Sequence, residues 1–475
     1  MKRSSFIRNS AIVGAGLLIK PKLFAGSPIA GSAFPVVRVA ADKRHFSSPA
    51  IEDAISRFDK GVANRELAWL FNNCFPNTLD TTVTHQTLDG RPDTYVITGD
   101  IDAMWLRDST AQVWPYLPFA AKDKQLHNLI AGVVNRQTTC ILKDPYANAF
   151  YNDPAKQGEW KSDMTDMKPG VHERKWEIDS ICYPIRLAYH FWKTTGDESI
   201  FNDKQQLALR TILKVFKDQQ RKESDGPYKF QRTTNHATDT LSMGGYGNPV
   251  NPVGLICSAF RPSDDATVFP FLIPSNFFAV KSLEQAAEIA TRVYKDQSLA
   301  TELSALATEV KQALVKHAVT VHPKYGKVYA FETDGFGNHY LMDDANIPSL
   351  LAMPYLGTVS ASDPVYINTR KMVLSEANPF YYSGTAAAGV GGPHVGKDMV
   401  WPMSIIIRGM TSRDDKEIKS CLETLRKTHA GTGFMHESFH KDDAAKFTRS
   451  WFAWANTLFG EFCWKVFLEK PYLLK

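Results

Sequence analysis

Helical periodicity is the feature that most constrains how this chain can fold. Apolar residues recur three and four positions apart over about a dozen segments, the pattern of helices with one buried face. Strand-like stretches are short and cover residues 94–98, 253–258 and 327–331. The predicted helices cover residues 50–73, 105–120, 122–142, 176–195, 199–222, 265–293, 297–318, 343–355, 363–375, 398–411, 414–430 and 447–468.

The way these segments follow one another favours a closed ring of paired helices over a solenoid. A solenoid repeats its sequence at a fixed period, and no such repeat is present in this chain. The loops between the helices carry the unusual polar, Gly-rich and Pro-rich stretches. The sequence therefore predicts an all-α fold, an (α/α)6 toroid of paired helices with short β-hairpin insertions.

One large domain is expected to follow the N-terminal segment. Hydrophobic residues make up 44% of the 475 residues, which is enough for an extensive buried core. Neither a low-complexity linker nor an abrupt change of composition follows residue 45. We therefore expect a single domain over residues 45–475.

The first 32 residues have the three-part pattern of a signal peptide. Lys2, Arg3 and Arg8 precede an apolar run over residues 11–19, and small residues follow over 25–32. The apolar run is too short to span a bilayer permanently. We expect export to the periplasm or the extracellular space, with a disordered N-terminal tail as the alternative. The exact cleavage site stays open.

Charge and cysteine content exclude two further classes. The net charge is only +5, and Lys and Arg form no run of five or more, so no nucleic-acid partner is expected. The six cysteines lie far apart with no Cys-x-x-Cys pair, which favours buried free thiols over a disulfide framework. The sequence leaves the oligomeric state open.

Residues 99–109, GDIDAMWLRDS, gather several chemically active side chains at the start of a predicted helix. Carboxylates and an arginine form charge-assisted hydrogen bonds to hydroxyl groups, and an indole covers the C–H face of a sugar ring. Asp102, Trp105, Arg107 and Asp108 are therefore candidate sugar-binding residues. The alternative is structural: Asp100 or Asp102 caps the helix and Arg107 pairs with Asp108.

Two further acidic motifs are expected just before helices. FRPSDDA (260–266) contains Arg261, Asp264 and Asp265, and DDAN (343–346) contains Asp344. A desolvated carboxyl that keeps its proton is what a general acid requires, although helix capping explains at least one acid of each pair. At the start of a helix, adjacent side chains point about 100° apart. We therefore expect only one of Asp264 and Asp265 to face a pocket.

Residues 436–440, HESFH, match the zincin pattern H-E-x-x-H. His436 and His440 would then bind zinc with Glu437 as base, and Glu461 follows as a possible third ligand. A zincin needs both histidines on one face of a helix, whereas here glycines precede the motif and the convincing helix begins only after Lys446. A zinc peptidase stays an alternative function.

Taken together, the motifs resemble those of glycoside hydrolase family 125, the metal-independent exo-α-1,6-mannosidases. The resemblance covers residues 99–460, with the motifs in order and none broken. It rests on GDIDAMWLRDS (99–109), KWEIDS (175–180), FRPSDDA (260–266), IPSN (273–276), DDAN (343–346), WPMS (401–404) and GFMHESF (433–439).

The resemblance implies residue roles as well as a fold. It implies an (α/α)6 catalytic domain that hydrolyses α-mannosides with inversion and without metal or cofactor. Asp264 would be the general acid, with Asp265 as the less favoured choice, and Glu437 the general base. In an inverting enzyme the two carboxyl groups lie roughly 6.5–9.5 Å apart. The residues expected to line the terminal-sugar pocket are Asp102, Trp105, Arg107, Asp108, Arg261, Asp265, Asp344, His394 and His436.

A third class of function also fits the motifs. A non-catalytic glycan-binding protein would use the same aromatic and acidic side chains only to hold sugar. Hydrolysis of mannosides, peptide cleavage and binding without cleavage are therefore the three outcomes that an assay has to separate.

Overall fold

The computed structural model describes residues 34–475, and the predicted signal peptide over residues 1–32 lies outside them. The described chain is mainly helical. Its α-helices are α1 (Pro49–Gly61), α2 (Arg65–Cys74), α3 (Asn77–Thr81), α4 (Leu106–Val113), α5 (Lys124–Lys143), α6 (Ile178–Thr195), α7 (Asp203–Asp218), α8 (Ile273–Arg292), α9 (Gln297–His317), α10 (Pro364–Val373), α11 (Pro402–Met410), α12 (Asp415–Lys427) and α13 (Ala453–Glu469).

The strands are short and form antiparallel sheets of two or three strands. They are β1 (Val83–Leu88), β2 (Arg91–Val96), β3 (Met104–Trp105), β4 (Ala149–Phe150), β5 (Val171–Glu173), β6 (Phe271–Leu272), β7 (Val319–His322), β8 (Gly326–Tyr329), β9 (Glu332–Thr333), β10 (His339–Tyr340), β11 (Tyr381–Ser383), β12 (Ala388–Val390), β13 (Met399–Val400), β14 (Ser438–His440) and β15 (Asp443–Thr448). A 3-10 helix, η2 (Trp114–Phe119), continues α4.

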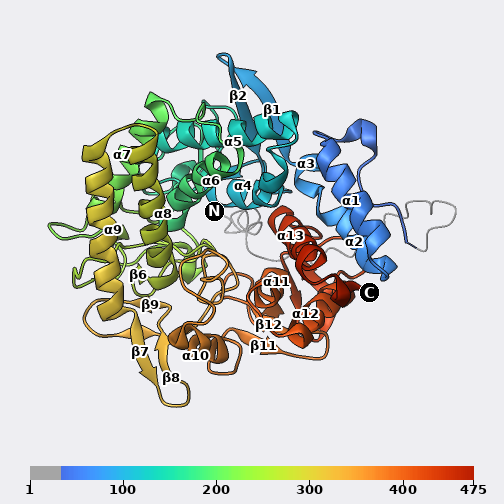
Figure 1. The fold of residues 1–475 in the computed structure, drawn as a ribbon. Coiled ribbons are helices and arrows are strands. Elements are labelled where there is room, and N and C mark those ends of the chain that lie inside the picture. Colours follow the sequence, from blue (N-terminus) through green and yellow to red (C-terminus); the bar gives the residue numbers. More distant parts are fainter. Residues whose placement is uncertain (1–33) are drawn as a thin grey trace, which may run out of the picture.

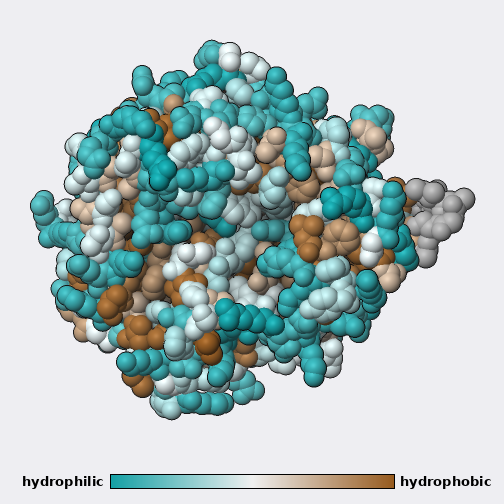
Figure 2. All heavy atoms as spheres, viewed as in Figure 1, coloured by the Kyte–Doolittle hydropathy of each residue, from teal (hydrophilic) through white to brown (hydrophobic). Residues whose placement is uncertain are grey.

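The helices follow one another around a ring that the C-terminus closes. In Figure 1 the chain passes from the blue N-terminal helices through green and yellow to the red α13, which returns beside the start. α13 packs against α2, α3 and α4, and α4 packs against α6. Hydrophilic residues cover most of the face shown in Figure 2, and apolar residues form scattered patches on it.

Burial separates inner helices from outer ones. Every residue of α4 is buried, and most of α6 and α13 is buried too. The outer α7 and α12 instead bury one stripe, and the side chains of Asn202 and Asp414 cap their N-termini. The polar residues at the first turns of the inner helices therefore lie inside the ring.

Two predicted elements are absent. Residues 343–355 form bends and turns. The Asp343 carboxylate accepts the backbone N–H groups of Leu350 and Leu351, which a helix would need for its own hydrogen bonds. Pro348 has no backbone N–H and therefore cannot donate a helical hydrogen bond. Residues 253–258 form a loop and no strand. The predicted helix over 50–73 is two helices, α1 and α2, and the one over 265–293 begins only at Ile273.

Other expectations agree with the structure. All six cysteines are buried and free. Within residues 34–475, each helix is too short or too polar to cross a bilayer.

Gly460 provides a test of the packing that closes the ring. A Cβ added to this α13 residue would lie 2.5 Å from Phe75 Cδ2 and 2.8 Å from Phe75 Cα, and the backbone atom cannot rotate away. We expect Gly460→Ala to lower the free energy of unfolding by about 1–3 kcal/mol, the usual cost of overpacking, although alanine is the better helix former. Thermal and denaturant unfolding measure this change. Ser304→Ala at an exposed position of α9 is the control, and equal stability of both variants with the wild type would contradict this packing.

Candidate active site

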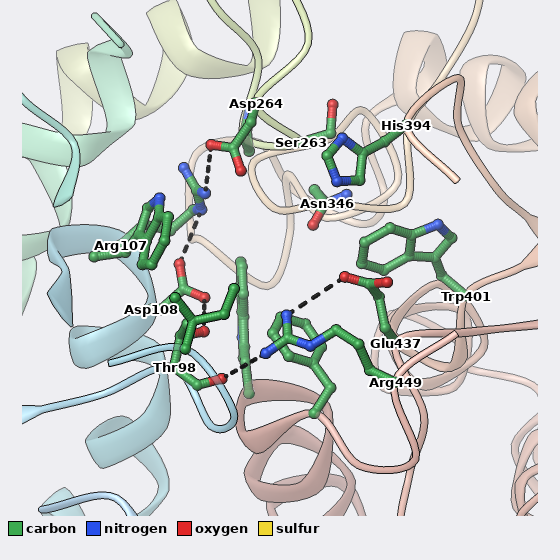
Figure 3. Close-up of a pocket in the computed structure, with 15 residues that line it drawn as sticks. Thr98, Arg107, Asp108, Ser263, Asp264, Asn346, His394, Trp401, Glu437 and Arg449 are labelled. Carbon is green, nitrogen blue, oxygen red and sulfur yellow. Dashed lines mark hydrogen bonds and ion pairs between the residues drawn. The ribbon is translucent and has the colours of Figure 1, made fainter. Parts of the chain in front are cut away.

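A pocket of about 150 Å³ lies where the inner helices begin (Figure 3). Its side chains come from the segments before and at the start of α4, α11 and α13 and from loops between distant helices. The lining residues are Thr98, Ile101, Trp105, Arg107, Asp108, Pro262, Ser263, Asp264, Asn346, His394, Trp401, Glu437, Arg449, Phe452 and Trp454.

Arg107 is the charge centre at one side of this pocket. Its guanidinium lies 2.5 Å from Glu177 and 3.3 Å from Asp179, and it also pairs with Asp108 at 3.4 Å and Asp264 at 3.7 Å. One cation therefore faces four carboxyl groups. Burial raises the pKa of Glu177 well above its usual range, and Asp179 and Asp264 add to that rise while Arg107 opposes it. In this cluster Glu177 therefore favours its protonated form, while Arg107 carries the positive charge.

Asp264 reaches the pocket from a tight turn. The turn is closed by the Asp264 amide donating to the Arg261 carbonyl oxygen at 2.9 Å, and Asp264 itself has φ 66°. This left-handed conformation is uncommon outside glycine and costs energy, which is typical of functional sites. Asn148 Nδ2 donates to Asp264 Oδ1 at 3.3 Å, and Lys175 Nζ donates to its carbonyl oxygen at 2.9 Å.

Glu437 enters the pocket from the segment just before β14, which pairs with β13 and β15. Arg449 Nη1 lies 3.4 Å from Glu437 Oε1. The same guanidinium donates to the carbonyl oxygen of Thr98 at 3.1 Å and pairs with Asp100. Arg449 thus fixes the position of Glu437 relative to the loop before α4, as Figure 3 shows.

His394 adds a positive charge to the lining of the pocket. Its Nδ1 is 3.8 Å from Asp265 Oδ1. Burial lowers the pKa of His394, but Asp265, Glu437 and Asp264 outweigh that effect and raise it to about 9. His394 is therefore a cation at neutral pH.

Aromatic side chains supply the apolar part of the pocket. Trp105, Trp401, Trp454 and Phe452 line it. The indole N–H groups of Trp105 and Trp401 are buried and have no hydrogen-bond partner within residues 34–475. A buried donor without a partner costs about 1–3 kcal/mol, so these two covered N–H groups are an energetic cost of the way the pocket wall is packed.

Six of the eleven residues predicted for the site line this pocket, and five do not. The six are Trp105, Arg107, Asp108, Asp264, His394 and Glu437. Arg261, Asp265, Asp344 and His436 are buried behind it. Arg261 pairs with Glu332, Asp344 accepts from Ser263, and His436 stacks on Phe447 at 3.9 Å.

Asp102 lies outside the pocket, contrary to the prediction. Its side chain is 73% exposed and pairs with Lys156. The expectation that Asp264 and Asp265 stand at a helix start is also wrong, because α8 begins eight residues after Asp265, at Ile273. Only Asp264 nevertheless lines the pocket, because the turn at φ 66° directs the two side chains differently.

The zincin geometry is absent at residues 436–440. His440 is the last residue of strand β14, and His436 precedes that strand. Four residues of extended chain span about 13 Å, which is too far for both histidines to bind one zinc ion. Glu461 lies in α13 and accepts a hydrogen bond from Tyr355. Within residues 34–475, no three His, Cys, Asp or Glu side chains form a group that could hold a metal ion.

Comparisons with known proteins identify the family of this chain. The sequence profile of the family described as metal-independent alpha-mannosidase (GH125) matches residues 64–464. The chain belongs to family GH125. It is 42% identical over 461 residues to the Meiotically up-regulated gene 157 protein of Schizosaccharomyces pombe, covering 93% of this chain and 90% of that protein.

A solved structure of a GH125 relative is similar throughout. It is a Streptococcus pneumoniae metal-independent alpha mannosidase in a non-productive substrate complex with alpha-1,6-mannobiose. That chain is 42% identical, with a TM-score of 0.86, and the match covers 90% of this chain and all of the other. Membership of GH125 makes this chain an α-mannosidase-family glycoside hydrolase.

Several pocket residues of this GH125 chain had no signal in the sequence. Arg449 lies in an ordinary TRSW stretch, and only the β14–β15 hairpin brings it to Glu437. Ser263 and Asn346 stand beside predicted acids and could have been found as their neighbours. Thr98 reaches the site because its hydroxyl donates to Asp108 at 2.9 Å.

The His394–Asp265 pair in this GH125 site makes a testable pH prediction. We expect Asp265→Asn to move the pKa of His394 from about 9 toward its ordinary value of about 6.5, because the main opposing charge is removed. In the wild type this raised pKa contributes stability that is fully present below about pH 6.5 and is lost as pH rises through about 9.

NMR titration of the histidine ring protons measures the shift. Asp166→Asn, which removes an acid that is 77% exposed, should leave the pKa of His394 where it is. An unchanged titration in Asp265→Asn would contradict the assigned pair.

Proposed function

We propose that this chain is an inverting, exo-acting α-mannosidase that removes terminal α-1,6-linked mannose from glycans. The observation that carries the proposal is the convergence of Asp264 and Glu437 on one small pocket from different loops, each within ion-pair distance of an arginine. The complex of the Streptococcus pneumoniae relative with alpha-1,6-mannobiose supports the linkage.

Asp264 is proposed as the general acid and Glu437 as the general base. Asp264 protonates the glycosidic oxygen as the bond to C1 breaks, and Glu437 takes a proton from the water that attacks C1 from the opposite face. Arg449 lies 3.4 Å from Glu437 and holds its carboxyl group in the pocket. Arg107 lies 3.7 Å from Asp264, and it also pairs with three other carboxyl groups.

The size of the pocket supports exo action. Its volume of about 150 Å³ is smaller than the roughly 300–1,000 Å³ of most small-molecule sites. A pocket of that size accommodates a terminal residue and leaves the rest of the glycan outside. Trp105 and Trp401 supply aromatic surface that can cover the C–H face of the sugar ring.

The domain and location belong to the same proposal. Residues 45–475 would be one (α/α)6 catalytic domain, supported by the closure of the helical ring through α13 against α2 and α4.

Export to the periplasm or the extracellular space, directed by residues 1–32, would bring the enzyme to external glycans. The proposal of export rests on the order of residues in that segment, in which basic residues come first, an apolar run follows and small residues come last.

The acid and base assignments predict the outcome of two isosteric substitutions. We expect Asp264→Asn and Glu437→Gln each to lower kcat on α-1,6-mannobiose by roughly 10²–10⁴-fold, because each removes one proton transfer and leaves the pocket shape unchanged. Asp166→Asn is the matched control. Mannose release at near wild-type rate by either variant would refute the assignment.

The same assay separates the two other classes of function. Mannose release should continue with a strong chelator present, whereas chelator-sensitive cleavage of a peptide mixture would identify a zinc peptidase. Retention of mannan without any release of mannose would identify a glycan-binding protein.

Stereochemistry tests the mechanism independently of rate. If a water molecule stands between Glu437 and C1, the carboxyl groups of Asp264 and Glu437 are separated by more than about 6 Å and the first product is β-mannose. Proton NMR during the first minutes of hydrolysis distinguishes the anomers before mutarotation. Initial release of α-mannose would instead indicate a covalent intermediate and a gap of roughly 5 Å.

A further inference from the structure

A second cavity, of about 580 Å³, lies further along the same inner helices. Arg186 in α6 and Glu461 in α13 line it, together with Trp114 in η2 and Tyr355. Arg186 comes seven residues after Asp179, and Glu461 seven residues after Trp454. Seven residues of helix span about 10 Å, so this cavity begins about 10 Å further along α6 and α13 than the candidate active site and reaches the C-terminal end of α13.

Arg186 is the unusual residue of this cavity. It is only 5% exposed. Its guanidinium stacks on Trp114, 3.6 Å from the ring centre, and lies 5.2 Å from the centre of the Tyr355 ring. Within residues 34–475 it has neither a hydrogen bond nor an ion pair. A guanidinium has five N–H donors, and leaving buried donors unsatisfied costs free energy. The rings hold Arg186 in place and leave its donors available to a ligand.

Glu461 complements Arg186 across the cavity. Its Oε2 accepts a hydrogen bond from the Tyr355 hydroxyl at 2.9 Å. Burial raises the pKa of Glu461 to about 7, so near neutral pH it offers either a carboxylate acceptor or a carboxyl donor. Of the other cations that line the cavity, Lys465 is paired with Glu469 and Lys470 with Asp415, whereas Arg413 has no ion pair within residues 34–475.

These side chains select among classes of ligand. An anion would pair with Arg186 but would meet the acidic Glu461, and a cation would meet the unpaired Arg186. A neutral ring with several hydroxyl groups can accept from Arg186, exchange hydrogen bonds with Glu461 and contact the aromatic rings. The volume falls within the roughly 300–1,000 Å³ of ordinary ligand sites.

We propose that this cavity is a second carbohydrate site, which binds a neutral pyranose residue of a glycan away from the candidate active site. The choice of a mannose-containing glycan as its ligand rests on the proposed function. Such a site would hold a polymeric substrate while the active site removes terminal residues.

Affinity electrophoresis in gels containing soluble α-mannan tests the proposal. All proteins carry Glu437→Gln, so that the polymer is not degraded during the run. We expect added Arg186→Met to weaken mannan binding roughly tenfold, the worth of one hydrogen bond to a charged group. Ala361→Trp, which fills the cavity from its wall and removes no polar group, should weaken it as much. Arg292→Met, at a side chain of α8 that is 67% exposed, is the matched control and should bind like the background protein.

The outcomes are distinguishable. Unfolding midpoints verify that each variant is folded. Arg186→Met removes hydrogen-bond donors, whereas Ala361→Trp fills the cavity, so the two variants test the site independently. Unchanged retardation of both folded variants would overturn the proposal. So would a result in which Ala361→Trp abolishes the ³¹P NMR line broadening of inorganic phosphate by the protein but leaves the saturation-transfer NMR signal of methyl α-D-mannopyranoside unchanged. Retardation needs no turnover, so a wild type that binds mannan through this cavity yet releases no mannose would refute the proposed function alone.

Discussion

The buried guanidinium of Arg107 is the interaction on which the candidate active site depends. It joins the first turn of α4 to the start of α6 through Glu177 and Asp179, and it reaches Asp264 on a loop far along the chain. Removing one partner of a buried ion pair costs several kcal/mol because the other charge stays uncompensated. Arg107 therefore fixes the relative positions of three chain segments, and the small pocket exists only while they are held together.

Electrostatics divide the pocket into two sides. On the Arg107 side, acids outnumber cations, and burial raises the pKa of Asp108, Asp179 and Glu177. On the Glu437 side, Arg449 and the protonated His394 supply positive charge that Glu437 shares with Asp100 and Asp265. The two sides of the pocket therefore give their carboxyl groups different surroundings, and different surroundings are what the proposed acid and base would need.

The sequence predicted site residues best where chemically active side chains lie at the start of a segment with clear helical periodicity. Arg107, Asp108 and Trp105 open a helix that is buried on all sides, so both their type and their position were visible. The sequence placed Asp102 in the pocket, but the loop before α4 directs its side chain to solvent. No sequence pattern indicates that loop conformation. Residues 343–355 have helix-like composition, but the Asp343 carboxylate accepts the backbone N–H groups of Leu350 and Leu351 within that segment. Arg449 meets Glu437 only because β14 and β15 pair. Side-chain contacts and strand pairing decide these cases, and a single sequence does not show them.

The direction of the inner helices connects the two cavities. The candidate active site lies at the N-terminal ends of α4, α6, α11 and α13, because Trp105, Trp401 and Phe452 stand at the N-caps of α4, α11 and α13, and Arg107 pairs with Glu177 at the N-cap of α6. Helix N-termini carry partial positive charge and C-termini partial negative charge. The acids of the active site therefore gather where helix ends stabilise anions. At the other end, where the negative ends of α11 and α13 converge, the second cavity carries Arg186, Arg413, Lys465 and Lys470. The shared direction of these helices therefore places partial positive charge beside the acids of the candidate active site, and the C-terminal ends of α11 and α13 place partial negative charge beside the cations of the second cavity.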